Sequence, residues 1–208
     1  MEWKEAASVQ RGENAARGTP TSASYLFRGP TAADARAVWE LVADCRPLDP
    51  NSLYCNLLQC THFAETCILA EQGGRIRGWV SAYRPPTDPQ TLFIWQVAIP
   101  REARGCGLAS SLIKELLQRD AVRGIRQLQA TVTRDNKASW ALFRSVADSL
   151  NAPLISQAHF DREQHFGGRH QSEYMLTIGP WHASAAESGH RSAGVNHITP
   201  RERKTDAL

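Results

Sequence analysis

The chain has 208 residues, of which 42% are hydrophobic and 22% charged, which suits one domain with a substantial core. Its apolar runs are short and its net charge is only +3 with scattered basic residues, so we expect no membrane segment and no nucleic-acid partner. Five cysteines without a Cys-x-x-Cys pair predict reduced thiols in a cytoplasmic protein and no metal site.

Both ends of the chain differ in composition from its middle. Residues 1–23 and 181–208 are rich in Ala, Ser, Gly, Arg and Glu without a sustained period, which predicts disordered extensions. The first of them has no apolar stretch long enough for a signal peptide, so export is not expected. The folded domain is predicted to span residues 24–180.

Hydrophobic periodicity predicts alternating elements within this domain. Residues 25–28 form a short strand, and Thr31-Ala-Ala-Asp34 is a capping box that opens a helix with an apolar stripe through Val38 and Val42. The order expected is strand, two helices, three strands, helix, strand, helix and two strands. The later elements are helix 52–60, hairpin strands 66–71 and 76–83, strand 91–99, a helix from Leu108, strand 125–133, helix 137–150, and strands 154–159 and 172–178.

The stretch from Trp95 to Ser111 carries the clearest chemistry. The apolar strand 91–99, expected to be central and buried on both faces, runs into a glycine-rich turn and then an amphipathic helix. Unpaired N–H groups at that helix start form an anion site, and Gly105 and Gly107 let the backbone approach phosphates closely. No Gly-Lys-Ser/Thr follows and the spacing differs from a dinucleotide fingerprint, so either a diphosphate-binding turn or a turn without a ligand remains.

Two motifs resemble the GNAT family of acetyltransferases. Arg104-Gly-Cys-Gly-Leu-Ala109 resembles its pyrophosphate loop, and Asn136, after a strand and before Ala138, resembles its second signature, although Asn136 could equally cap the helix. The resemblance implies an α/β (α+β) fold with a mixed central sheet, splayed strands and flanking helices. It also implies acetyl-CoA as co-substrate, held without a metal by Val97, Ile99, Arg104, Gly105, Cys106, Gly107, Leu108, Ala109 and Asn136.

A narrower resemblance covers about residues 27–178. The blocks 46–66, 93–97 and His165-Phe-Gly-Gly168 resemble the GNAT-family L-2,4-diaminobutyrate acetyltransferases of ectoine biosynthesis. This implies a small diamino acid acetylated on its 4-amino group, and a homodimer. The other readings are a GNAT enzyme for a different amine and a regulatory module that only binds acyl-CoA.

The residues suit such an acceptor, which carries a carboxylate and two ammonium groups. Asp49 and Glu173 can pair with ammonium, and Trp95 offers a cation–π face. Tyr54 and His165 can hydrogen-bond or transfer protons, so Asp49, Tyr54 and His165 are the candidate catalytic residues.

Each acceptor assignment has a competing interpretation. The competing interpretation of Asp49 is a turn former without a ligand, and that of Trp95 is a core residue. His62 and His159 compete with His165, and Glu163 competes with Glu173, and the sequence alone does not separate them.

The expected reaction is direct attack in a ternary complex. Phe143 stands where many family members have a Tyr that protonates the leaving thiolate, so either the thiolate leaves unassisted or another group such as Tyr54 acts. Cys106 lies in the phosphate loop without a visible His partner, so we do not assign it as a nucleophile.

Overall fold

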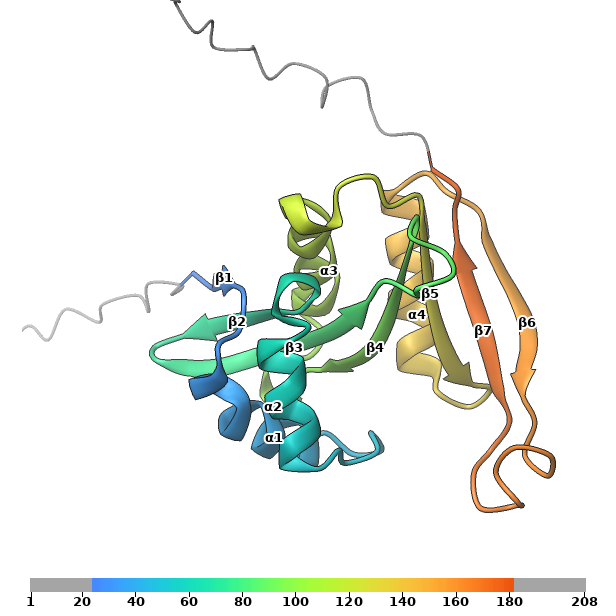
Figure 1. Cartoon of the computed structure of the whole chain (residues 1–208), viewed down its shortest axis with the longest axis horizontal. Coiled ribbons are helices and arrows are strands. Elements are labelled where there is room, and N and C mark those ends of the chain that lie inside the picture. The colour runs from blue at the N-terminus through green and yellow to red at the C-terminus, as the bar shows by residue number, and fades with distance from the viewer. Residues whose placement is uncertain (1–23, 182–208) are drawn as a thin grey trace, which may run out of the picture.

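A computed structural model describes residues 24–181, and the predicted extensions fall outside the described residues except for Trp181. A seven-stranded sheet in the order β1-β2-β3-β4-β5-β7-β6 forms the middle of the molecule (Figure 1). All neighbouring strands are antiparallel except β4 and β5. The strands are β1 (Leu26–Arg28), β2 (Ile68–Gln72), β3 (Arg75–Tyr83), β4 (Thr91–Ala98), β5 (Gln127–Thr133), β6 (Leu154–Phe160) and β7 (Glu173–Ile178).

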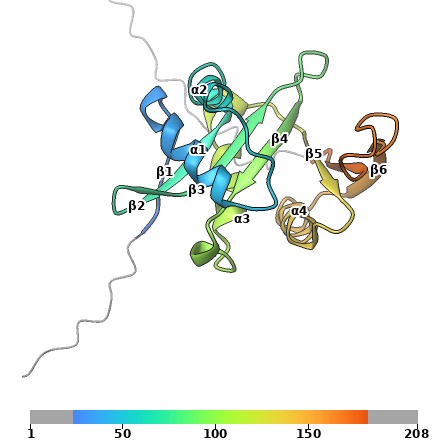
Figure 2. The same ribbon diagram turned by 90° about the horizontal axis from the view of Figure 1, so that it is seen from below.

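Four α-helices cover the two faces of this sheet, which gives three layers (Figure 2). One face packs against α1 (Ala35–Asp44) and α2 (Leu53–Thr61), and the other packs against α3 (Leu108–Leu117) and α4 (Lys137–Ser149). The predicted order of elements is confirmed, with boundaries shifted by one or two residues except at the first helix, where residues 32–34 form a 3₁₀ turn after the predicted cap and α1 begins at Ala35. Gly78 permits the close packing of β3 on α3, because a Cβ there would lie 2.7 Å from Leu112 Cδ1.

The parallel strands β4 and β5 separate partway along their length. Their register covers only Thr91–Phe93 against residues 127–129, after which β5 continues beside β7 and β4 continues beside β3. The β5-facing edge of residues 94–98 therefore has no partner strand within the described chain. The splayed strands expected from the resemblance are confirmed.

Strand β4 also contains a β-bulge. Ser81 of β3 pairs with Gln96 while Ala82 pairs with Ile94, which leaves Trp95 as the extra residue. Its side chain is 44% exposed, so the expectation that this strand is buried on both faces throughout is wrong at Trp95. The bulge reverses which residues face each helical layer: Ile94 lies in the core under α3 and α4, whereas Ala98 lies in the core under α1 and α2.

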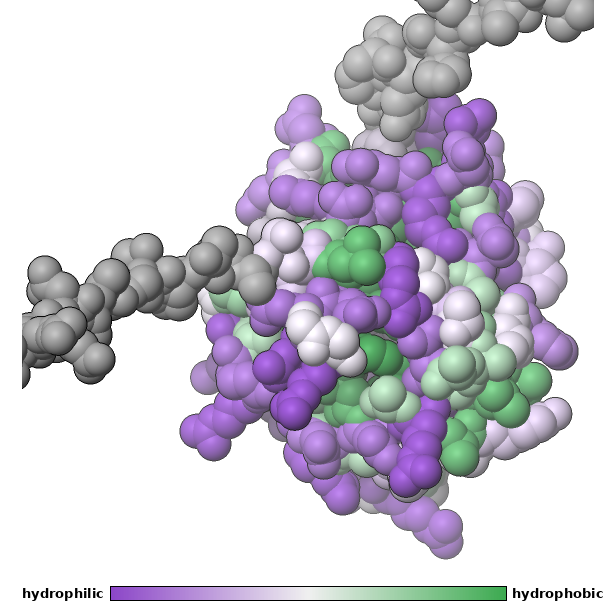
Figure 3. Space-filling model, turned by 90° about the vertical axis from the view of Figure 1, so that its left-hand side faces the viewer, coloured by the Kyte–Doolittle hydropathy of each residue, from purple (hydrophilic) through white to green (hydrophobic). Residues whose placement is uncertain are grey.

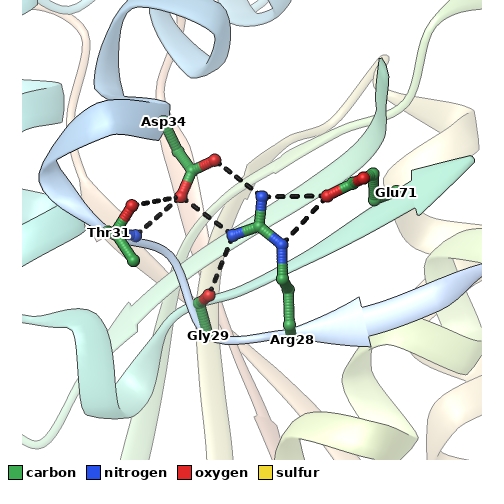
Figure 4. Close-up of polar contacts among 5 residues, drawn as sticks. All are labelled: Arg28, Gly29, Thr31, Asp34 and Glu71. Atoms are coloured by element: carbon green, nitrogen blue, oxygen red, sulfur yellow. Dashed lines mark hydrogen bonds and ion pairs between the residues drawn. The ribbon is translucent and has the colours of Figure 1, made fainter. Parts of the chain in front are cut away.

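A network of charged groups fixes the start of α1 to the sheet edge (Figure 4). The Arg28 guanidinium donates to Asp34 at 2.7 and 2.9 Å and to Glu71 at 3.0 Å. Asp34 also accepts the N–H and hydroxyl of Thr31, each at 2.8 Å, in the predicted capping box. Arg28 and these donors hold the pKa of Asp34 at about 2, well below its usual value of 3.8.

The face of the molecule on the left-hand side of Figure 1 carries both hydrophobic and hydrophilic side chains. Figure 3 shows several small hydrophobic patches separated by hydrophilic side chains. None of the helices within residues 24–181 is long and apolar enough to cross a membrane.

Candidate active site

A cavity of about 540 Å³ opens where the glycine-rich turn, the start of α4 and the loop after α1 meet. Eight of the nine residues predicted to contact acetyl-CoA line it: Val97, Ile99, Arg104, Gly105, Gly107, Leu108, Ala109 and Asn136. The unpaired edge of β4 reaches this cavity at Val97. The structure thus gathers the expected cofactor residues around one space.

The turn before α3 presents main-chain N–H groups. Gly105 and Gly107 have φ of +78° and +80°, a left-handed conformation that favours glycine. Ser111 is the first residue of α3 whose N–H reaches back along the helix, to the Gly107 carbonyl at 3.0 Å. The preceding N–H groups of Leu108, Ala109 and Ser110 are those that a helix start leaves available for an anion.

Arg104 and Cys106 behave differently within this turn. The Arg104 side chain lines the cavity, and its Nε donates to the Ile99 carbonyl at 2.9 Å, which ties the turn to the end of β4. Cys106 is exposed and does not line the cavity, and its Sγ contacts the Ala103 carbonyl at 3.1 Å.

Asn136 combines the two roles that the sequence left open. Its side-chain oxygen accepts the Ser139 N–H at 3.1 Å and so caps α4, while the residue also lines the cavity. The cap uses only the oxygen, and the side-chain NH₂ group donates to no residue of the described part of the chain.

Sequence reasoning missed two groups of cavity residues. The loop after α1 contributes Cys45–Leu48, which nothing in the local pattern marked as cofactor-facing. Helix α4 contributes Ala138, Ala141 and Ser145, whose spacing along one helix face and small size could have revealed them. Burial raises the pKa of the Cys45 thiol, so this cavity-lining sulfur is held in its protonated, weakly nucleophilic form.

The candidate acceptor residues lie around a more open surface. Asp49, on the loop between α1 and α2, has a 71% exposed side chain, and its Oδ2 lies 3.5 Å from Nε2 of His170. The residues between β6 and β7, which carry His170, thereby meet the loop that carries Asp49. The sequence did not single out His170, because nothing in a single sequence shows which residue of a long loop reaches a distant partner.

His165, the predicted histidine, is positioned differently. Its Nδ1 accepts the Asp161 N–H at 2.8 Å, and its ring packs on Phe160 at 5.6 Å between centroids. These contacts stabilise the turn in which His165 itself lies. The structure brings His170, and not His165, beside Asp49.

The remaining acceptor candidates come from three separate elements. Trp95 contacts Tyr83 edge-on at 6.3 Å between ring centroids. Tyr54 lies in the first turn of α2 with 68% of its surface exposed. Glu173 is the first residue of β7 and is half-buried, paired across the sheet with Thr133 and Phe160, whereas its competitor Glu163 is exposed and contacts Arg162 at 3.3 Å.

Comparison with known proteins identifies the family of a chain that has this cavity at a helix start beside two splayed parallel strands. The model of the acetyltransferase (GNAT) family matches residues 35–147. This chain belongs to the GNAT family. The match covers the loop after α1, the glycine-rich turn and most of α4, which are the parts that line the cavity.

Relatives within the GNAT family share much of the described chain. The L-2,4-diaminobutyric acid acetyltransferase of Methylotuvimicrobium alcaliphilum is 45% identical over 157 residues, which is 76% of this chain and 91% of the relative. That of Halomonas elongata is 44% identical over 161 residues, covering 76% and 83%. By this similarity the chain falls among the diaminobutyrate acetyltransferases of the GNAT family.

Solved GNAT structures agree with this placement. The diaminobutyrate acetyltransferase of Paenibacillus lautus, in complex with its substrate L-2,4-diaminobutyric acid and coenzyme A, has a TM-score of 0.75 at 36% identity and covers 78% of this chain and 99% of that one. A ribosomal-protein-alanine N-acetyltransferase from Brucella melitensis has a TM-score of 0.57 at 21% identity, covering 73% and 98%, and supports the fold alone.

Phe143 is a core residue in this GNAT chain. Its side chain is 4% exposed and packs within the cluster under α3 and α4. A phenyl ring has no proton to donate, so this position contributes packing in place of acid catalysis.

Proposed function

We propose that this GNAT chain transfers the acetyl group of acetyl-CoA to the 4-amino group of L-2,4-diaminobutyrate, giving 4-N-acetyl-L-2,4-diaminobutyrate. This is the step of ectoine biosynthesis that the sequence resemblance implies. The observation that carries the proposal is the similarity to a diaminobutyrate acetyltransferase solved with its substrate and coenzyme A, which covers 78% of this chain and 99% of that one. The 540 Å³ cavity supports it with a place for the cofactor.

In this proposal the cavity holds acetyl-CoA. The pyrophosphate lies against the N–H groups from Gly105 to Ala109, beside the Arg104 cation. The pantetheine arm follows the unpaired edge of β4. Ile99, just after this strand, and Asn136, at the start of α4, offer it hydrogen-bonding groups. Val97 is the residue of β4 that lines the cavity, and its N–H is the proposed donor to the thioester oxygen, where negative charge develops during the attack.

The acceptor amine attacks the thioester directly. An alkyl ammonium must first lose a proton, which the carboxylate of Asp49 can accept directly or through water while His170 lies 3.5 Å from it. Nitrogen then bonds to the carbonyl carbon, the tetrahedral intermediate collapses, and coenzyme A leaves as a thiolate that takes up a proton. The raised pKa of Cys45 argues against an acetylated cysteine intermediate at the cavity wall.

Side chains around Asp49 are proposed to orient the diamino acid. Trp95 offers its exposed ring to an ammonium group, Glu173 a second negative charge, and Tyr54 a hydroxyl for hydrogen bonding or for protonating the thiolate. His165 stabilises the loop in which His170 lies. The homodimer, the cytoplasmic location and the absence of nucleic-acid and membrane partners remain predictions.

The test is a thiol-release assay with acetyl-CoA and a panel of amines. We expect turnover of L-2,4-diaminobutyrate, with NMR placing the acetyl group on the 4-amino nitrogen, and much weaker turnover of ornithine, lysine, spermidine and a short peptide. Acetylation of another amine in preference would overturn the substrate. Tight acetyl-CoA binding without turnover of any amine would identify a binding module instead.

A further inference from the structure

The side chain of Gln96 is buried where an apolar residue would be expected. It directly follows the bulged Trp95 on β4, is 7% exposed, and lies on the side of the sheet covered by α1 and α2. Burying an amide costs free energy unless both of its polar ends find partners. The identity of those partners shows what this glutamine does.

Both ends of the Gln96 amide bind the loop that carries Asp49. Nε2 donates to the main-chain carbonyl of Asp49 at 2.9 Å, and Oε1 accepts from Nδ2 of Asn51 at 2.8 Å. The loop is held from its other side as well, because the Trp39 indole of α1 donates to the Asn51 carbonyl at 2.9 Å. Strand β4 and helix α1 thus both hydrogen-bond to the segment from Asp49 to Asn51.

This segment lies between the two halves of the site. Residues 45–48, just before Asp49, line the acetyl-CoA cavity, and Asp49 itself projects outward to His170. On β4, Gln96 lies between Trp95, a candidate acceptor residue, and Val97, a candidate oxyanion donor. A single buried amide therefore connects the strand that carries Trp95 and Val97 to the loop that carries Asp49.

We propose that Gln96 is a positioning residue that sets the place of the Asp49 carboxylate relative to the thioester. It touches neither substrate nor cofactor and acts through the main chain of Asp49 and the side chain of Asn51. This inference rests on the proposed function, since it takes Asp49 as the group that receives the amine. Its mechanism is preorganisation: the Asp49 side chain is highly exposed, so its backbone anchor, together with the 3.5 Å contact to His170, restricts where the carboxylate lies.

The main test replaces Gln96 by methionine, which has similar length and volume but removes both hydrogen bonds. We expect kcat/KM for diaminobutyrate to fall about 10-fold or more, with the Kd for acetyl-CoA changing less than about 2-fold. Ser81→Ala is the matched control. Ser81 is the cross-strand neighbour of Gln96, is fully buried, and its hydroxyl has no partner among the described residues, so this change should leave kcat/KM within about 2-fold of wild type.

A double-mutant cycle with Asp49→Asn separates positioning from general loss of structure. If Gln96 acts through Asp49, Gln96→Met should cost less than about 3-fold in the Asp49→Asn background. Equal losses in both backgrounds, or a parallel loss of acetyl-CoA binding, would overturn the inference. A normal rate for Asp49→Asn alone would instead refute the proposed acceptor site, so the two failures are distinguishable.

A second variant covers the case in which Gln96→Met does not fold. Trp39→Phe removes the indole donor to Asn51, with part of the ring, from a partly exposed site, and it tests the same anchor from the helix side. We expect a smaller loss of kcat/KM, about 3-fold, again without a change in acetyl-CoA affinity and again suppressed by Asp49→Asn. A loss that persists in the Asp49→Asn background would contradict the anchor.

Discussion

The two halves of the candidate site are built by different means. The cofactor half uses backbone N–H groups, two glycines at positive φ and small side chains, and these belong to a few short segments that line one cavity. The acceptor half uses side chains from α2, β4, β7 and two loops, and Asp49, Tyr54 and Trp95 are all substantially exposed. Backbone-built sites are fixed by the fold, whereas side-chain sites depend on whatever anchors each loop.

The largest effect should come from the backbone-built half. Gly107→Val places a β-branched residue at φ +80°, which costs about 1–2 kcal/mol in backbone strain and shifts the N–H groups that face the pyrophosphate. We expect the Kd for acetyl-CoA to rise about 100-fold by isothermal titration calorimetry. Gly73→Val, at φ +59° in the β2–β3 hairpin, has comparable strain and no cofactor role, so affinity there should stay at the wild-type level.

Next in size is the carboxylate of the acceptor half. Asp49→Asn removes the charge that pairs with the amine, and kcat/KM for diaminobutyrate should fall about 10- to 100-fold in steady-state assays. Affinity for acetyl-CoA should not change, because Asp49 does not line the cavity. The control is Asp44→Asn, an exposed Asp at the end of α1 and five residues before Asp49, which should leave both constants unchanged. Equal loss of both constants in Asp49→Asn would mean that the two halves are not separate.

A comparison of His170 with His165 tests which histidine acts in the acceptor half. His170→Gln removes the partner of the Asp49 carboxylate, and we expect kcat/KM to fall about 10-fold with a changed pH–rate profile. His165→Gln loses the turn contact to the Asp161 N–H and the ring packing on Phe160, and kcat/KM should fall less than about 3-fold without a change in profile. The reverse ranking would restore His165 as the functional histidine.

The Arg28 network lies outside the site, so substitutions in it should change the stability of the fold and not the activity. Because the folded-state pKa of Asp34 is lowered to about 2, its contribution is fully present above about pH 4 and is lost as pH falls towards 2. Asp34→Asn should lower the free energy of unfolding by about 1–2 kcal/mol at pH 7 and flatten its dependence between pH 4 and 2, measured by urea titration. Asp120→Asn, whose partner Arg123 is mostly exposed, should cost less than about 0.5 kcal/mol.

The smallest effect is expected at Cys106. Its side chain is exposed and lies outside the cavity, so Cys106→Ala should change kcat and acetyl-CoA affinity by less than about 2-fold. Abolished turnover in a folded Cys106→Ala protein would reinstate a cysteine nucleophile and contradict direct attack.

Local sequence patterns predicted the order of elements and a set of residues that the structure places around one cavity. The glycine turn before α3 and the Asn136 cap are short-range features, and the cavity gathers around both. The bulge at Trp95 was not predictable, because one extra residue in an apolar run leaves the run apolar while it changes which face each side chain occupies. The Asp49–His170 contact joins residues 121 positions apart (170 minus 49), and no local rule selects one histidine over another at that range.

The short register between β4 and β5 has a mechanical consequence. Only three residue pairs join one leaf of the sheet, β1 to β4, to the other leaf, β5 to β7, before the strands diverge. A cofactor seated between them would act as a wedge that also bridges the two leaves. Bound acetyl-CoA would then stabilise the folded protein as well as react in it, so the melting temperature should rise with the concentration of acetyl-CoA.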